Sequence, residues 1–142
     1  MKHEIINQFK NYFAHLNLSD LSALDDIYSD EITFTDPIHQ VNGIDSLKQY
    51  FATLNKNLVH GSFHFTDETV TDNETYLQWE VSLTLKKPDK TITATGISVL
   101  TIDEKIIRHR DYFDAGELFY EHIPVLGAFI RIFKKKIRAA TT

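Results

Sequence analysis

The sequence predicts an α+β fold, in which helices come first along the chain and a run of antiparallel strands follows. Apolar residues recur at helical spacing through much of residues 3–54, whereas apolar and polar residues alternate within residues 76–114. The chain has 142 residues, 42% of them hydrophobic, which suits one domain with a sizeable core. Segregation of helices from an antiparallel sheet defines the α+β class.

Three helices are predicted in the first part of the chain. The first covers about residues 3–16, where apolar side chains at three- and four-residue spacing form one stripe. Ser19 or Asp20 is expected to cap the second helix, with Tyr28 on its buried face. The third helix begins after Asn42-Gly43 and turns its own apolar stripe inward.

Strands are predicted after the second and third helices. They are expected at about residues 32–35, 61–70, 76–85, 91–102 and 106–114. Short turns join the last three, so these strands should form an antiparallel meander. In the first of the three, Trp79 and Val81 share the apolar face. The last strand carries ionisable residues on both faces, which indicates that it lines something other than a dry core.

Composition excludes several classes of function. The net charge of −5 and the sequence pI near 5.7 argue against general nucleic-acid binding. The absence of cysteine excludes disulfides, thiolate catalysis and Cys-ligated metal sites. No metal is expected at His60 and His64, because a strand would place them out of line for a helical zinc pair. With no signal-like segment and no apolar run approaching ~20 residues, a cytoplasmic location is the default expectation.

The charge is distributed unevenly along the chain. Five of the fifteen basic residues lie within residues 131–138, so residues 1–130 carry ten basic and twenty acidic residues, a net charge of −10. A basic amphipathic helix is predicted from about residue 125 to 138. We therefore divide the chain into a domain of residues 1–120 and a C-terminal segment of residues 121–142. That helix is expected to pack on the domain or on a partner subunit, and the alternative is a peripheral contact with an anionic membrane.

Two segments resemble known enzymes. The stretch from Tyr12 to Pro37 resembles the start of ketosteroid isomerases without a gap, and Gly43 before an amphipathic helix fits the same pattern. The segment Arg110-Asp-Tyr-Phe-Asp114 resembles the last strand of limonene epoxide hydrolase. Over roughly residues 5–120 the chain is thus similar to the nuclear transport factor 2-like (NTF2-like) superfamily, which includes the SnoaL-like polyketide cyclases. The resemblance implies a cone-shaped curved sheet wrapped by three helices, a deep apolar pocket for a small hydrophobic ligand, and a homodimer.

The resemblance to ketosteroid isomerases assigns roles to three residues. Asp36 falls at the position of the proton-shuttling carboxylate, and Tyr12 at that of the oxyanion-hole tyrosine. Ser98 falls where those enzymes have a protonated aspartate, so steroid isomerisation itself is not expected. The residues alone leave alternatives open: Asp36 before a proline can simply cap a turn, and Tyr12 can be a core tyrosine with one hydrogen bond.

A second set of candidates lies on the last strand. Asp111 matches a catalytic carboxylate of limonene epoxide hydrolase, but the partner arginine and aspartate align with Trp79 and Val81, so epoxide hydrolysis is not expected. Strand alternation places His109 beside Asp111, where the two could form a general acid/base pair or a buried structural pair. Residues expected to contact substrate are Phe34, Trp79, Val81, Ser98 and Phe113.

Three classes of function are compatible with these observations. The expected one is an enzyme without a cofactor that moves a proton on a hydrophobic substrate, as an isomerase, dehydratase or cyclase. A cavity that brings Tyr12, Asp36, His109 and Asp111 together would favour it. A non-catalytic carrier of a hydrophobic ligand is favoured if structural partners occupy those groups. An interaction module is favoured if side chains such as Trp79 and Phe113 fill the pocket.

Overall fold

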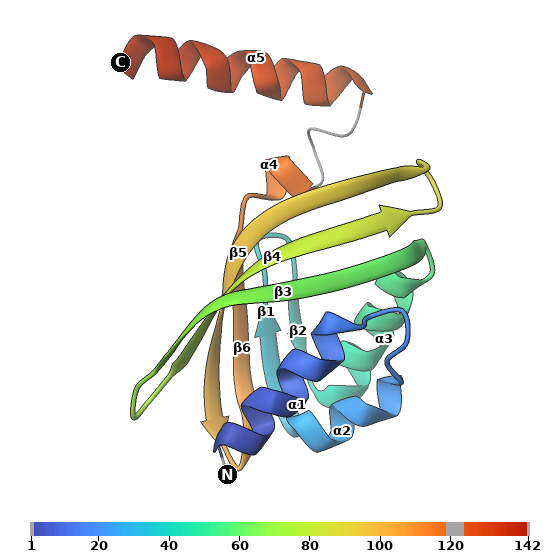
Figure 1. The fold of residues 1–142 in the computed structure, drawn as a ribbon, viewed down its shortest axis with the longest axis vertical. Coiled ribbons are helices and arrows are strands. Elements are labelled where there is room, and N and C mark those ends of the chain that lie inside the picture. Colours follow the sequence, from blue (N-terminus) through green and yellow to red (C-terminus); the bar gives the residue numbers. More distant parts are fainter. Residues whose placement is uncertain (1, 119–123, 142) are drawn as a thin grey trace.

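The computed structural model describes residues 2–118 and 124–141, which form the predicted α+β fold (Figure 1). The helices are α1 (Lys2–Ala14), the 3₁₀ helix η1 (Leu21–Ala23), α2 (Leu24–Ile27), α3 (Ile44–Asn55), α4 (Ala115–Leu118) and α5 (Pro124–Thr141). The strands are β1 (Tyr28–Thr35), β2 (Gln40–Asn42), β3 (Leu58–Val70), β4 (Thr75–Leu85), β5 (Lys90–Asp103) and β6 (Lys105–Phe113).

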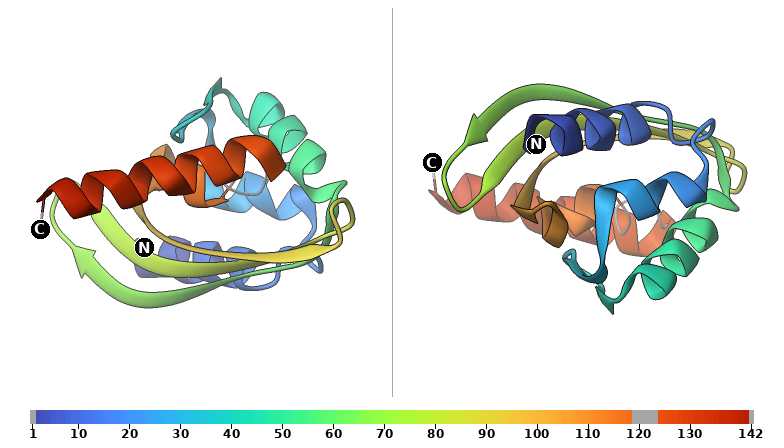
Figure 2. Two further views of the ribbon diagram at one scale, coloured as in Figure 1. Left: turned by 90° about the horizontal axis from the view of Figure 1, so that it is seen from above. Right: turned by 90° about the horizontal axis from the view of Figure 1, so that it is seen from below.

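Within these residues the strands form one sheet in the order β2-β1-β6-β5-β4-β3. Neighbouring strands are antiparallel except β1 and β6, which run parallel. The predicted meander is confirmed as β4, β5 and β6. The sheet is strongly curved and does not close, and α1, α2 and α3 lie on its concave side (Figures 1 and 2).

The core lies between the curved sheet and these helices. Each helix turns the apolar stripe read from the sequence toward the sheet, and the sheet presents every second residue of its strands to the helices. Burying one such large side chain contributes about 1.5–3 kcal/mol relative to leaving it in water. Inward-facing residues that fill this space include Ile6, Phe9, Phe13, Leu47, Phe51, Leu77 and Leu100.

The region of the second predicted helix differs from the expectation. Asp20 does act as a cap, because its Oδ1 accepts a hydrogen bond of 2.9 Å from Ser22 N. The capped segment, however, is a 3₁₀ turn followed by four α-helical residues, and Tyr28 is the first residue of β1. The placement of Tyr28 on a helix was therefore wrong. Its buried side chain has its hydrogen-bond partner on β6, and that tertiary contact overrides the local helical pattern.

The short strand β2 was not predicted either. Gly43 separates β2 from α3 and has φ 89°, a conformation that a residue with Cβ adopts only with strain. Its backbone N–H donates to Ile32 O at 2.8 Å, which ties the start of α3 to β1.

The C-terminal helix α5 lies beyond the end of the sheet where α4 is found (Figure 1). A hydrogen-bonded ion pair of 2.6 Å joins Lys134 Nζ to Asp114 Oδ2, and Ile130 lies close to Gly116. Among the described residues, no helix is both long enough and apolar enough to span a bilayer.

We expect Gly96→Ala to destabilise the fold. Gly96 lies opposite Trp79 on β4, and a Cβ added there would overlap the indole ring and come within 2.6 Å of the Tyr112 carbonyl oxygen. Overpacking of this kind costs about 1–3 kcal/mol, so urea denaturation should show a lower free energy of unfolding. Gly116→Ala is the control, since its new Cβ would meet mainly the mobile ends of side chains. Equal stability of the two variants would contradict the packing described for Trp79.

Candidate functional site

His109 is the centre of the candidate site. It lies on the inward face of β6, 1% exposed, with the rings of Phe9, Phe13 and Phe34 presented edge-on around it. Its Nδ1 is 2.8 Å from the Tyr28 hydroxyl, and its Nε2 is 2.7 Å from Asp111 Oδ1. Both ring nitrogens of this buried imidazole are thus satisfied, as the cost of burying an unpaired polar group requires.

The hydrogen bonds continue from Asp111 to two neighbouring strands. Ser98, which lies opposite Asp111 on β5, donates to Asp111 Oδ1 at 2.5 Å. Trp79 Nε1 donates to the same serine oxygen at 2.9 Å. With Asp111 ionised, the hydrogen bonds form two branches that end at Oδ1. In one branch Trp79 donates to Ser98 and Ser98 donates to Asp111, and in the other Tyr28 donates to His109 and His109 donates to Asp111. The structure shows no hydrogen bond to Asp111 Oδ2 from the residues it describes.

A small cavity adjoins this network. It is lined by four aromatic residues of α1 and β3 and by three members of the network: Phe9, Phe13, Phe63, Phe65, Ser98, His109 and Asp111. Its volume is ≈ 10 Å³, which is about the space that a single water molecule needs. The side chain of Asp111 is 14% exposed, so its carboxylate is the partly accessible group of an otherwise buried cluster.

The expected substrate-contacting residues surround this cavity in different ways. Ser98 lines it, and its contact with substrate stays a prediction. Trp79 and Val81 belong to a second apolar cluster, in which the indole packs against Phe63 at 4.8 Å and Phe113 at 6.2 Å between ring centroids. Phe34 packs edge-on against His109 at 4.8 Å. None of the residues Phe34, Trp79, Val81 and Phe113 is among those that line the cavity.

Asp36 has structural partners on both carboxylate oxygens. Oδ1 accepts hydrogen bonds from the backbone N–H groups of Ile38 and His39, at 2.8 and 2.7 Å, which is the turn-capping arrangement. Oδ2 accepts one of 2.7 Å from the Tyr50 hydroxyl. Burial and these contacts to Asp36 raise the pKa of Tyr50 above its ordinary range. The structure thus joins Asp36 to Tyr50 and does not place it among the residues that line the cavity.

Tyr12 is also separate from the cavity. It is buried, but it lines a surface groove between α1 and the η1–α2 segment together with Asp20. Its hydroxyl has no hydrogen-bond partner in the described part of the chain. Burial, with a smaller effect of the Asp20 charge, raises the pKa of Tyr12 to about 12. The roles that resemblance assigns to Tyr12 and Asp36 stay predictions.

Tyr28 is the member of the network that sequence reasoning missed. Burial first, and then the charge of Asp111, raise the pKa of Tyr28 well above its ordinary value. It therefore stays protonated and can donate to His109. Its aromatic character fitted either a helical stripe or a strand, and the position of β1 beside β6 is what distinguishes the two. Within the described residues, no group of three or more His, Asp or Glu side chains is arranged to hold a metal ion.

The fold and the sequence together show the family. The chain belongs to the SnoaL-like domain family, whose pattern matches residues 9–109. This match confirms the SnoaL-like relationship expected from the sequence. No curated protein matches the chain. Solved structures described as NTF2-like or ketosteroid isomerase-like share the fold over most of the domain.

Three of these structures illustrate the likeness. A protein of ketosteroid isomerase-like fold from Catenulispora acidiphila, in complex with trimethylamine, aligns with TM-score 0.71 and 14% identity over 81% of this chain and 88% of its own. An NTF2-like protein of unknown function from Exiguobacterium aligns with TM-score 0.66 and 20% identity, covering 78% and 98%. A candidate SnoaL-like polyketide cyclase from Jannaschia aligns with TM-score 0.68 and 13% identity, covering 78% and 83%.

We expect opposite results from removing two buried tyrosine hydroxyls. Tyr28→Phe leaves Nδ1 of buried His109 unpaired and should lower the free energy of unfolding by about 1–3 kcal/mol. Tyr12→Phe removes a buried hydroxyl that has no partner among the described residues and should raise that free energy by about 1 kcal/mol. Each substitution removes the same atom, so each is the control for the other in chemical denaturation. Equal destabilisation by both would contradict the hydrogen-bond assignment.

Stability should fall in alkaline solution because of the same tyrosines. The pKa values of Tyr12, Tyr28 and Tyr50 are raised in the folded protein, so deprotonation is easier in the unfolded chain. Their contribution is complete below the ordinary tyrosine pKa of 10.0 and is lost as the pH rises through the folded value, about 12 for Tyr12. Denaturation midpoints should therefore decrease above pH 10, and less steeply in Tyr12→Phe. A pH-independent midpoint in that range would exclude this linkage.

Proposed function

We propose that the protein is a small-molecule enzyme of the isomerase or cyclase kind, in which Asp111 transfers a proton on a hydrophobic substrate. The observation that carries this proposal is the asymmetry of the Asp111 carboxylate. Oδ1 receives hydrogen bonds from Ser98 and His109, whereas no described residue donates to Oδ2. A carboxylate oriented through one oxygen and open at the other has the geometry of a general base.

The proposed chemistry is removal of a proton from a carbon next to a carbonyl group. The C–H bond breaks, its electron pair moves into the enolate, and Oδ2 of Asp111 becomes protonated. Return of the proton to another carbon completes an isomerisation, and attack of the enolate carbon on a second carbonyl completes a cyclisation, with the proton delivered to the new alkoxide. Both sequences balance without an external oxidant, reductant or cofactor.

The surrounding residues support this chemistry by orienting the carboxylate. Ser98 and His109 hold Oδ1 in place, and Trp79 and Tyr28 hold those two residues in turn. The substrate is proposed to be hydrophobic, because the cavity walls are the rings of Phe9, Phe13, Phe63 and Phe65. The relation to a candidate polyketide cyclase is consistent with carbon-acid chemistry. The expected homodimer stays a prediction.

One observation favours a second function. The cavity of ≈ 10 Å³ is far smaller than the ~300 Å³ or more that small-molecule sites commonly have. A substrate would have to displace aromatic side chains to enter the cavity. An interaction module needs no internal cavity, because it binds its partner through the outer surface of the domain. We retain this non-catalytic module as the alternative, ahead of a hydrophobic-ligand carrier, which would also need an open volume.

The test is deuterium uptake from heavy water into a panel of hydrophobic ketones and 1,3-dicarbonyl compounds, followed by NMR. The wild-type protein should catalyse exchange at the activated carbon. Asp111→Asn should reduce the rate by about 10²–10⁴-fold, because an amide cannot accept the proton at neutral pH. The fold should survive, since the amide oxygen can replace Oδ1 as the acceptor for Ser98 and His109.

Asp36→Asn is the matched control, because it makes the same chemical change at a carboxylate whose oxygens are already hydrogen-bonded. We expect it to keep the exchange activity. Loss of activity in Asp36→Asn with retention in Asp111→Asn would move the base to Asp36, as the isomerase resemblance predicts. No exchange with any compound of the panel by the folded wild-type protein would favour the interaction module.

A further inference from the structure

The C-terminal helix α5 exposes a continuous apolar stripe. Phe129, Phe133 and Ile137 are spaced four residues apart and therefore lie along one side of the helix. Their side chains are 68%, 58% and 48% exposed, and Ile132 beside them is also exposed. Large apolar residues gathered on one exposed face are unusual on a protein that works alone in water. This stripe needs a partner.

The opposite side of α5 is basic. With about 3.6 residues per turn, Arg131, Lys135 and Arg138 fall on the side opposite Phe133. Lys134 lies between the two sides, and Lys136 lies at the edge of the apolar side, between Phe129 and Ile132. The helix contains no acidic residue. Long lysine and arginine side chains can carry their charges to the level of lipid headgroups while the apolar stripe enters the acyl region. The helix therefore has the two faces that an anionic membrane surface requires.

The domain itself leaves this stripe uncovered. The contacts described for α5 run through Ile130, near Gly116, and through the Lys134–Asp114 ion pair. Ile130 and Lys134, the two α5 residues in these contacts, lie toward one edge of the apolar side of the helix. Phe129, Phe133 and Ile137 remain exposed in spite of these contacts. The packing on the same domain that the sequence suggested does not account for them.

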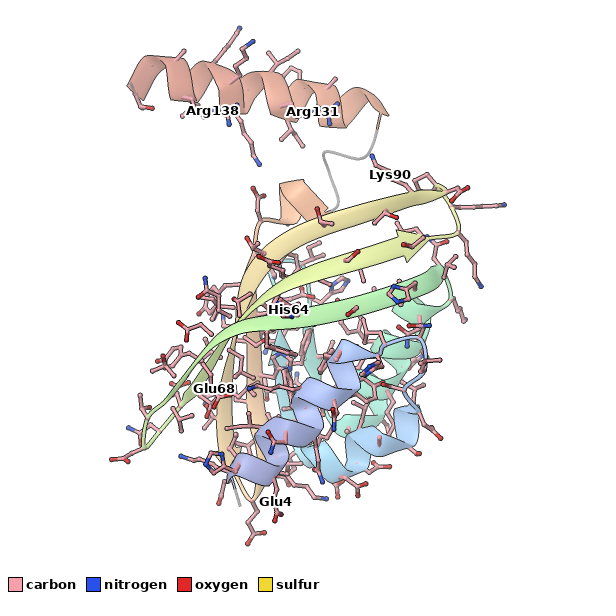
Figure 3. All side chains as sticks on the ribbon, viewed as in Figure 1. Glu4, His64, Glu68, Lys90, Arg131 and Arg138 are labelled. Carbon is pink, nitrogen blue, oxygen red and sulfur yellow. The ribbon has the colours of Figure 1, made fainter. Side chains whose placement is uncertain are left out.

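The charge of the whole molecule is polarised along its long axis. The lining of a groove near the N-terminus includes one lysine, Lys105, and six carboxylates: Glu4, Asp26, Asp30, Glu31, Asp103 and Glu104. Figure 3 shows Glu4 at the end of the molecule opposite Arg131 and Arg138. A negatively charged surface would attract the α5 end and repel the acidic end, so the molecule would approach with α5 foremost.

A second copy of the chain matches these features less well. Pairing two α5 helices through their stripes would bring two sets of five positive charges to one interface. Docking α5 into the acidic groove of another copy would match charge, but carboxylates cannot cover Phe129 and Phe133. That contact is also head-to-tail, so it would extend into an open chain unless its rotation closed a ring.

We propose that α5 binds the surface of an anionic lipid bilayer, with Phe129, Phe133 and Ile137 inserted at the interface and the basic residues among the headgroups. Helix α5 lies in the plane of the membrane and does not cross it. The curved domain remains outside the bilayer. This inference rests on α5 alone and is independent of the chemistry proposed for Asp111.

Co-sedimentation of the full-length protein with vesicles tests the proposal. We expect binding to phosphatidylcholine vesicles that contain phosphatidylserine, little binding to phosphatidylcholine alone, and weaker binding as the salt concentration rises. Lys135→Gln with Lys136→Gln should reduce affinity roughly fivefold per lysine, or about 30-fold for the pair. Phe129→Ser with Phe133→Ser should abolish detectable binding.

Matched controls exclude general effects of charge and hydrophobicity. Lys86→Gln with Lys87→Gln removes two exposed lysines from the β4–β5 turn, and Leu18→Ser removes an apolar side chain that is 79% exposed elsewhere. Both controls should bind vesicles like the wild type. All variants should keep the melting temperature of the wild type, because the altered side chains are exposed.

Insertion of the stripe can be observed directly in Phe133→Trp. The natural Trp79 is buried, so its emission provides a constant background. Binding to anionic vesicles should shift the emission of the new tryptophan to shorter wavelength. Absence of vesicle binding by the wild type at low salt, or binding that survives Phe129→Ser with Phe133→Ser, overturns the proposal. Dissociation of an oligomer by that double substitution in vesicle-free sedimentation assigns the stripe to a second copy instead.

Discussion

The structure depends on satisfying a buried imidazole. His109 lies among aromatic rings, where an unpaired nitrogen would cost about 1–3 kcal/mol, so each of its two nitrogens must have a partner inside the core. Tyr28 supplies one partner from β1, and Asp111 supplies the other from β6 itself. The first contact requires β1 to lie beside β6, and the parallel register pairs Phe34 with His109. One side chain thereby couples strand pairing, core packing and the orientation of the candidate base.

Asp111 is both a hydrogen-bond partner of the buried His109 and the base in the proposed reaction. Its carboxylate is a charge at the edge of an apolar core, and it is acceptable there because Ser98 and His109 donate to it. The aromatic rings that exclude water also leave little empty space. A preorganised carboxylate is useful for proton abstraction, because less solvent must be rearranged during the reaction.

Local patterns predicted the parts of the fold that depend on short-range order. Alternation identified the meander, and strand parity placed His109 beside Asp111, which the structure confirms. Tyr28 could not be assigned in this way, because its hydrogen-bond partner, His109, is distant in the sequence. Asp36 illustrates the same limit: the sequence allowed a turn cap or a base, and Tyr50 on α3, which occupies Oδ2, is brought to it only by folding.

The parallel pairing of β1 with β6 has a consequence for how the chain folds. The hydrogen bond between Tyr28 and His109 joins residues separated by 81 positions in the sequence. During synthesis, the N-terminal helices and β1 leave the ribosome before β6 has been translated. The aromatic side chains that will surround the imidazole are therefore not covered by β6 during that time. Closing so long a loop is entropically costly, and folds with distant pairings form more slowly than those with local ones. The site at the centre of the domain is thus among the last parts that a nascent chain can complete.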